Sequence, residues 1–122
     1  MNRVEIKIYV NDIEEERTYY QDKLGFVLKE VREGLEDTKE YVFAHEGSDA
    51  YFVLASREAA EKASPKENTD MPSILLHVSD IDTCYKQLRD QGVQVGELFE
   101  LGGMKTFNFC DHELNYMACW QA

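Results

Sequence analysis

Every second residue is apolar in two stretches of the chain, residues 4–10 and residues 73–78. Valine or isoleucine occupies positions 4, 6, 8 and 10 of the first stretch, and Ile74, Leu76 and Val78 fill the corresponding positions of the second. A period of two is typical of a β-strand that buries one face, so the pattern predicts a strand in each half of the chain.

A helical pattern follows each of these strands, begins after an aspartate and ends at a glycine. Asp12 and Asp80 stand at the predicted N-cap positions, and Glu15 completes a capping box with Asp12. Gly25 and Gly92 stand at the predicted C′ positions, where the backbone needs a positive φ. The repeated order of strand, aspartate, helix and glycine indicates two copies of one structural unit.

Three more strands are predicted after each helix. They cover residues 26–31, 41–45 and 51–54 in the first half, and residues 93–99, 105–110 and 116–120 in the second. Turns are predicted at 34–38, 46–49, 102–103 and 111–115. The pattern therefore predicts an α+β fold with βαβββ module one at residues 1–56, a linker with a short helix at 57–71, and βαβββ module two at 72–122, together forming one domain.

Acidic residues outnumber basic ones 24 to 13, which gives a formal net charge of −11 over 122 residues. An acidic surface repels phosphate backbones and anionic lipid, so neither nucleic acid nor a membrane is expected as a partner, whereas a cationic ligand is attracted. The alternative is that the charge only maintains solubility. Three cysteines without a CxxC spacing, together with the absence of an apolar leader, predict a cytoplasmic protein.

Short motifs in both halves carry a resemblance to a known superfamily. They are Val10-x-Asp12 with Tyr19-Tyr20 and Leu24-Gly25-Phe26, Val78-x-Asp80 with Gly92-Val93, and Phe109-x-Asp111 with the turn to Asn115. In this order they resemble the vicinal-oxygen-chelate superfamily, which includes lactoylglutathione lyases, extradiol dioxygenases, and fosfomycin-resistance and bleomycin-binding proteins. The last motif departs from the usual pattern, since His112 replaces proline and Leu114 replaces glycine. The resemblance implies mixed sheets that curl around a cleft, helices on the outer face, and a homodimer.

Enzymes of that superfamily hold a divalent metal with His, Gln or Glu side chains at four positions. Carried over to this sequence, the resemblance places those positions at Glu5, Val53, Ser73 and Ala118. Only Glu5 is a good ligand, because serine binds metals poorly and the other two side chains have no donor atom. The sequence therefore predicts no metal or other cofactor, leaves enzymatic activity uncertain and favours a binding protein over an enzyme.

A displaced metal site built from Glu5 and His77 is the alternative. His77 lies two residues, or about 6.7 Å along a strand, beyond Ser73, and this displacement argues against the alternative. Otherwise His77 is expected to be a neutral imidazole in the wall of the cleft. No phosphate-binding loop or nucleophile elbow is present, so the catalytic residues, if there are any, are unknown. Cys110 is expected to be a buried, inert thiol, the alternative being a nucleophile with His77 as its base, and Cys84 and Cys119 are expected to belong to the core.

Polar, aromatic and small side chains are expected to line the cleft, by strand alternation and by the geometry that the resemblance implies. The predicted ligand-binding residues are Glu5, Lys7, Tyr9, Tyr51, Val53, Ser73, His77, Asn108, Tyr116, Ala118 and Trp120. Aromatic rings and a carboxylate suit a planar or cationic ligand, held by stacking and cation–π contacts. The alternative is that these rings fill the cleft or contact a partner subunit.

Three functions are compatible with this sequence. The favoured one is a metal-free, homodimeric small-molecule-binding protein of the glyoxalase/bleomycin-resistance type, which binds or sequesters an aromatic or cationic compound. The second is a metal-dependent lyase, isomerase or dioxygenase of the same superfamily with a displaced or degenerate metal site. The third is an interaction module whose cleft is closed by side chains.

Overall fold

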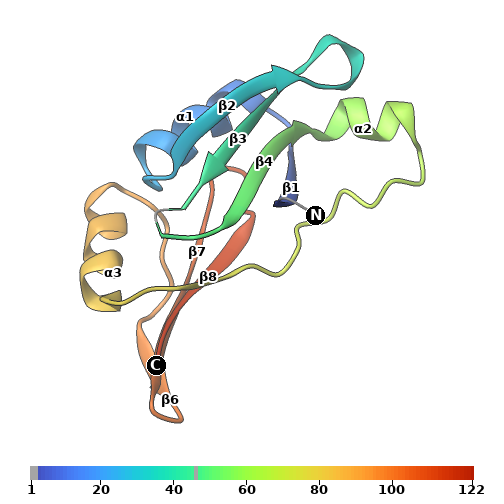
Figure 1. Cartoon of the computed structure of the whole chain (residues 1–122). Coiled ribbons are helices and arrows are strands. Elements are labelled where there is room, and N and C mark those ends of the chain that lie inside the picture. The colour runs from blue at the N-terminus through green and yellow to red at the C-terminus, as the bar shows by residue number, and fades with distance from the viewer. Residues whose placement is uncertain (1–2, 46) are drawn as a thin grey trace. The chain divides into compact units, whose positions relative to one another are not determined.

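The computed structural model describes residues 3–45 and 47–122, and the chain divides into two compact units (Figure 1). Unit 1 spans Met1–Met71 and unit 2 spans Pro72–Ala122. Unit 1 contains, in chain order, β1 (Val4–Val10), α1 (Ile13–Asp22), β2 (Val27–Glu33), the 3₁₀ turn η1 (Leu35–Asp37), β3 (Lys39–Ala44), β4 (Ala50–Ser56) and α2 (Arg57–Ala63). Unit 2 contains β5 (Leu75–His77), α3 (Ile81–Asp90), β6 (Phe99–Leu101), β7 (Met104–Cys110) and β8 (Tyr116–Gln121).

Each unit holds one mixed four-stranded sheet with the same topology. The strand order is β1-β4-β3-β2 in unit 1 and β5-β8-β7-β6 in unit 2. In both sheets the first strand pairs in parallel with the last strand of the unit, and the other neighbours are antiparallel. The α+β fold of two βαβββ units that the sequence predicts is therefore confirmed, and neither sheet is closed on itself.

The predicted ends of the two long helices are confirmed. The carboxylate of Asp12 accepts a hydrogen bond from the backbone N–H of Glu15, and that of Asp80 accepts one from Thr83. Beyond the last turns, Gly25 and Gly92 adopt φ values of 74° and 83°. Such values strain any residue that carries a Cβ, so glycine is the residue that lets the chain leave each helix.

Aromatic side chains form the core of unit 1 between α1 and its sheet. The fully buried ring of Tyr20 lies on the inner face of α1, with ring centroids 5.6 Å from Phe26 and 6.0 Å from Phe43. Phe26 in turn packs against Phe52 of β4 at 5.5 Å. One face of this sheet is thereby used for packing under the helix.

Unit 2 repeats this arrangement with α3 on one face of its sheet. Tyr85 of α3 meets Phe107 of β7 edge to face, with ring centroids 5.0 Å apart. Phe107, Phe109 and Met117 are all buried, as their alternation predicts. Their neighbours in the sequence therefore point to the face that α3 does not cover.

The prediction of a strand over residues 93–99 is wrong. This segment makes a single isolated bridge between Val95 and Phe109, and the pairing strand is β6, which begins at Phe99. Around the bridge, the backbone of Gly96 donates to Asn108 at 2.7 Å. Gly96 has no side chain to pack and weakens the hydrogen-bond ladder of a strand. The apolar residues on either side of Gly96 are therefore not enough to form a strand here.

Smaller differences concern strand ends. The alternating stretch at 73–78 forms a strand only at Leu75–His77, and Val4, at the free end of β1, is 53% exposed instead of buried. The short helix predicted after residue 57 is present as α2. Glu46, which belongs to the turn predicted at 46–49, lies outside the described residues. Among the helices of the described chain, none has the length and apolar content needed to cross a bilayer.

We expect Asp80→Ala to lower the free energy of unfolding, because it removes the oxygen that accepts the Thr83 N–H at 3.2 Å. Urea denaturation followed by circular dichroism measures the change. Asp90→Ala is the matched control, since Asp90 lies in the last turn of the same helix and forms an exposed pair with Lys86. Its effect should stay within about 0.5 kcal/mol. Equal losses in the two variants would contradict the capping role.

Candidate functional site

The face of the unit 1 sheet that α1 does not cover carries charged and polar residues. Glu5, Lys7 and Tyr9 alternate along β1, so they share this face. The register places them beside Tyr51, Val53 and Ala55 of β4, respectively. The five residues of unit 1 that the sequence assigns to the site, at positions 5, 7, 9, 51 and 53, therefore lie on one face of the sheet.

Arg32 spans this face from one edge strand of the sheet to the other. Its guanidinium makes a two-pronged contact with the Glu5 carboxylate, with N–O distances of 2.7 and 2.9 Å. Its Nε donates to Glu40 at 3.0 Å, and Lys7 donates to the other oxygen of Glu40 at 3.2 Å. Because β2 and β1 are separated by β3 and β4 in the sheet, this chain of ion pairs crosses the face from side to side.

Arg3 extends the network at the edge of the sheet. Its guanidinium pairs with Glu5 at 2.6 Å and with Glu30 at 3.1 Å. The same group lies over the ring of Tyr51, 4.6 Å from the ring centroid. The network thus joins three cationic side chains with three carboxylates and is neutral as a whole.

The network fixes the protonation state of its members. Hydrogen bonds from Arg32 and then from Arg3 lower the pKa of Glu5 from its ordinary value of 4.5 to about 2. The bond to Glu5 likewise raises the pKa of Arg32 above its ordinary value. Glu5 is therefore an ionised acceptor whose two oxygens are already engaged by guanidinium groups.

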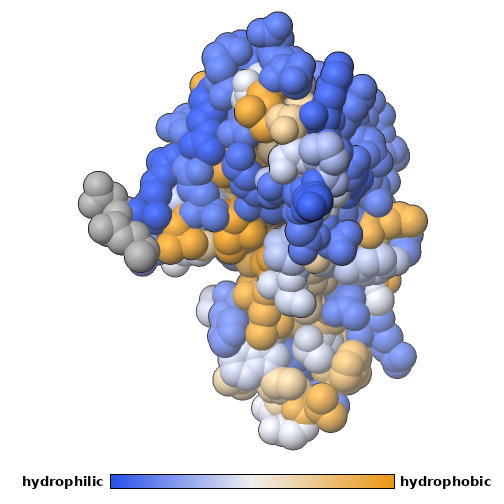
Figure 2. All heavy atoms as spheres, turned by 90° about the vertical axis from the view of Figure 1, so that its right-hand side faces the viewer, coloured by the Kyte–Doolittle hydropathy of each residue, from blue (hydrophilic) through white to orange (hydrophobic). Residues whose placement is uncertain are grey.

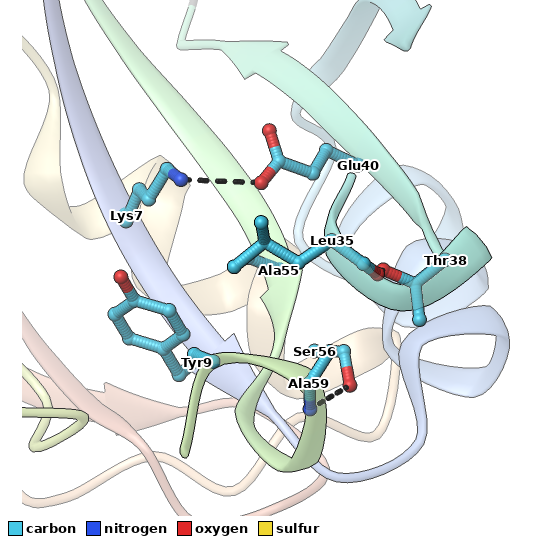
Figure 3. A pocket seen from close by; sticks show the side chains of 9 residues that line it. Lys7, Tyr9, Leu35, Thr38, Glu40, Ala55, Ser56 and Ala59 are labelled. Carbon is cyan, nitrogen blue, oxygen red and sulfur yellow. Dashed lines mark hydrogen bonds and ion pairs between the residues drawn. The ribbon is translucent and has the colours of Figure 1, made fainter. Parts of the chain in front are cut away.

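A small pocket opens beside the network, at the end of the face near α2 (Figure 3). Its empty space, including the open mouth, is about 230 Å³. Lys7 and Glu40 form one wall, and the ring of Tyr9 lies across from them. The remaining lining residues are Leu35, Thr38, Ala55, Ser56, Ala59 and Ala60. The space that a water-sized sphere can occupy inside it is only about 20 Å³, far below the 300–1,000 Å³ typical of drug-sized ligands, so the pocket holds little more than one water molecule.

The uncovered face of the unit 2 sheet has the opposite character. Strand register places His77 beside Trp120, and Ala118 between Leu75 and Asn108. Four apolar or aromatic side chains of this face remain strongly exposed: Leu75 (52%), Phe99 (47%), Leu101 (58%) and Tyr116 (53%). Figure 2 shows several orange patches among the blue and white atoms of the surface in view.

Two aromatic rings meet on this face, on the edge strand β5 and its neighbour β8. The imidazole of His77 packs against Trp120 with ring centroids 4.2 Å apart and an interplanar angle of 61°. The indole N–H of Trp120 donates to the sulfur of Met104 on the neighbouring strand. The hydroxyl of Thr106 donates to the backbone of Cys119 at 2.8 Å, which leaves its methyl group toward the face. The surface is therefore aromatic and apolar, with few unused donors.

Five of the predicted residues in unit 2 lie on this one face, at positions 77, 108, 116, 118 and 120. Ser73 precedes β5, is exposed and belongs to no strand. In unit 1, Val53 is fully buried, so its side chain is not available to contact a ligand.

Sequence reasoning missed several residues of these faces. Arg32 and Glu40 carry the ion pairs, Leu35 lines the pocket, and Phe99 and Leu101 extend the apolar face. The alternation of Glu30 with Arg32 signals that both lie on one side of their strand. No local pattern, however, reveals that Arg32 reaches the opposite edge of the sheet.

The side chains at the metal positions of the superfamily do not form a ligand set. Both oxygens of Glu5 accept bonds from arginines, and the other three positions hold valine, serine and alanine. Within residues 3–45 and 47–122, no group of three or more His, Cys, Asp or Glu side chains converges on a point where a metal ion would fit. A divalent ion needs several converging donors, so these residues do not fit one.

A family model for the Glyoxalase/Bleomycin resistance protein/Dioxygenase superfamily matches residues 2–111 of the chain. The chain belongs to this superfamily. Comparison with curated protein sequences gives no match.

Several solved structures have the same fold at low sequence identity. TnmS3, an antibiotic binding protein from Streptomyces sp. CB03234, is 20% identical with a TM-score of 0.79 over 99% of this chain and 95% of its own. A superfamily member from Sphaerobacter thermophilus DSM 20745 is 21% identical with a TM-score of 0.80 over 100% and 98%. TioX from Micromonospora sp. ML1 is 12% identical with a TM-score of 0.81 over 99% and 98%.

We expect the Glu5 network to make the protein acid-sensitive between about pH 4.5 and pH 2. The folded-state pKa is the lower one, so the unfolded chain takes up the proton first, and the stabilisation present above pH 4.5 is lost as the pH falls toward 2. The loss should be about 1 kcal/mol, because 24% of the Glu5 side chain is exposed and solvent screens the pair. Urea denaturation at a series of pH values measures it.

Glu5→Gln should flatten this part of the pH profile. Glu33→Gln is the control, because Glu33 pairs with Lys39 on the same sheet but is 72% exposed. A Glu5→Gln protein with an unchanged acid slope would contradict the assignment.

Proposed function

We propose that the protein binds a small aromatic or cationic compound without a metal ion. The observation that carries this proposal is the uncovered face of unit 2, where Tyr116, Trp120 and His77 present rings on a sheet surface instead of burying them in the core. Such a surface binds a planar molecule by stacking and by removing apolar area from water.

The acidic charge of the chain favours a positively charged ligand, and unit 1 shows with its own Arg3 how a planar cation can be held. The guanidinium of Arg3 lies over Tyr51 while it pairs with Glu5, so this face already accommodates a planar cation between a ring and a carboxylate. The net charge of −11 also raises the local concentration of cations near the chain. The same charge speaks against nucleic acid and anionic membranes as partners, and we place the protein in the cytoplasm.

The structural neighbours support the class of function. TnmS3 is an antibiotic binding protein, and another neighbour is a glyoxalase/bleomycin resistance protein from the same Streptomyces strain, 20% identical with a TM-score of 0.78. By analogy, binding or sequestering a compound is the role that we propose for this chain.

A metal-dependent lyase, isomerase or dioxygenase is the less favoured alternative. It would need Glu5 as a ligand, and the bonds from Arg32 would have to break first. An interaction module with a closed cleft is also less favoured, because Leu75 and Tyr116 are more than half exposed.

We further propose a homodimer. The exposed side chains of Leu75, Phe99, Leu101 and Tyr116 lie on one sheet face, where we call them the apolar strip, and monomeric proteins seldom leave so many large apolar side chains open on one face. A second copy that covers part of this strip would leave the rest to the ligand.

We expect proflavine, a planar aromatic cation, to bind saturably and to quench the fluorescence of Trp120, the single tryptophan of the chain. Titration at low ionic strength measures this, with the planar anion anthraquinone-2-sulfonate as the comparison probe. The cation should bind at least tenfold more tightly. Tyr116→Ala should weaken proflavine binding about three- to tenfold, because it removes one stacking ring.

Leu114→Ala is the matched control, since Leu114 is 59% exposed on the turn before β8, outside the strand face. Every titration is repeated with EDTA, and the metal content of the purified protein is measured by mass spectrometry. Binding abolished by EDTA, about one tightly held metal per chain, or no saturable binding of either probe would overturn the proposal.

We expect sedimentation equilibrium to show a dimer and Leu101→Glu to raise its dissociation constant at least tenfold, because a buried unpaired carboxylate is costly at an apolar interface. Leu114→Glu adds the same charge at a position with the same exposure outside the strip. A monomer at micromolar concentration, or equal effects of the two substitutions, would contradict dimerisation through this strip.

A further inference from the structure

Two of the three cysteines lie close together in unit 2, although 35 positions separate them in the sequence. Cys84 belongs to α3 and Cys119 to β8, and their sulfur atoms are 3.9 Å apart. A disulfide has an S–S distance of about 2.05 Å, so a shift of about 2 Å would bring the two sulfurs to bonding distance. This pair lies on the helix side of the sheet and takes no part in the faces described above.

The two thiols differ in access to solvent and in acidity. Cys84 is half-buried, whereas Cys119 is 1% exposed. The hydrogen bond between them lowers the pKa of Cys84 and raises that of Cys119, which burial raises further. The thiolate is the reactive form of cysteine, and a lower pKa favours it. Cys84 is therefore both the more accessible and the more reactive thiol of the pair.

We propose that Cys84 and Cys119 form a redox site that hydrogen peroxide or another hydroperoxide oxidises to an intramolecular disulfide. With hydrogen peroxide, the Cys84 thiolate attacks one oxygen, the O–O bond breaks, and a sulfenic acid and one water result. Cys119 then attacks the sulfenic sulfur, and the S–O bond breaks as the S–S bond forms, which releases a second water. In sum, two thiols lose two electrons and two protons, and one peroxide is reduced to two waters.

The disulfide would form on the helix side of the unit 2 sheet and would affect the proposed ligand-binding face on its other side. Cys119 stands in β8 between Ala118 and Trp120, whose side chains point to the opposite face of the sheet. A bond that draws Cys119 toward α3 therefore moves the backbone that carries the indole ring. It also restricts the unfolded chain, because it joins residues far apart in the sequence.

The test treats the reduced, full-length protein with a small excess of hydrogen peroxide. Free thiols counted in denaturant should fall from three to one, with loss of two hydrogen atoms of mass, and dithiothreitol should restore all three. The two thiols should react at least tenfold faster than the third. Oxidation should also raise the melting temperature by about 5 °C or more and change the fluorescence of Trp120.

Peptide mapping identifies the partners. Trypsin leaves Cys110 and Cys119 on one peptide, because no lysine or arginine lies between them, but a second cleavage after Glu113 separates them. A crosslink between the Cys84 peptide and the Cys119 peptide is the expected result. This map uses the unaltered protein, so it decides the question even where a cysteine variant fails to fold.

Cys110→Ala should retain the reaction, since Cys110 lies on β7 and takes no part in the pair, whereas Cys84→Ser should abolish it. A crosslink through Cys110, a disulfide between two chains, a sulfinic acid at Cys84 without a crosslink, or three thiols left intact would each overturn the proposal.

Discussion

Each four-stranded sheet of this protein has a long helix on only one of its faces, and this constraint shapes the rest of the molecule. A βαβββ unit places its helix between the first two strands in the chain, so the helix packs on one side, and the later strands return beside the first without adding a second layer. Tyr20 and Phe107 show how thoroughly the helix side is filled. The side chains of the other face of each sheet have no helix to pack against, and the proposed binding surfaces lie on these faces.

The two units solve this problem in opposite ways. In unit 1, long charged side chains reach across the sheet, and Arg32 bonds to Glu5 on the far edge strand and to Glu40 between them. The carboxylates and guanidinium groups satisfy one another and hold the face in one arrangement. In unit 2 the corresponding face carries rings and aliphatic side chains such as Tyr116 and Leu101, which water satisfies poorly. The charged groups on the face of unit 1 thus pair with one another, whereas the apolar side chains on the face of unit 2 would be stabilised by a bound molecule.

The sequence predicts the architecture well, because strand alternation, aspartate caps and terminal glycines are local signals that recur in both halves. It fails at residues 93–99, where apolar residues flank Gly96 and suggest a ladder that forms only one bridge. The faces are predicted by alternation, so Lys7 and Trp120 are placed correctly on their sheets. Contacts between distant strands are not predicted, since nothing near Arg32 or Cys84 in the sequence identifies Glu5 or Cys119 as a partner.

The ion pair between Arg32 and Glu5 also limits which substitutions could create a metal site at Glu5. A histidine introduced at position 53 would not by itself create a metal site, because Arg32 still holds both oxygens of Glu5. Removing Arg32 first would deprive Glu5 and Glu40 of the cation that they share, at a cost in stability. A metal centre at these positions would therefore require Arg32 and the non-ligating positions to change together. The exposed rings of unit 2 carry no such coupling between charged partners, so a single substitution there can change the proposed binding surface on its own.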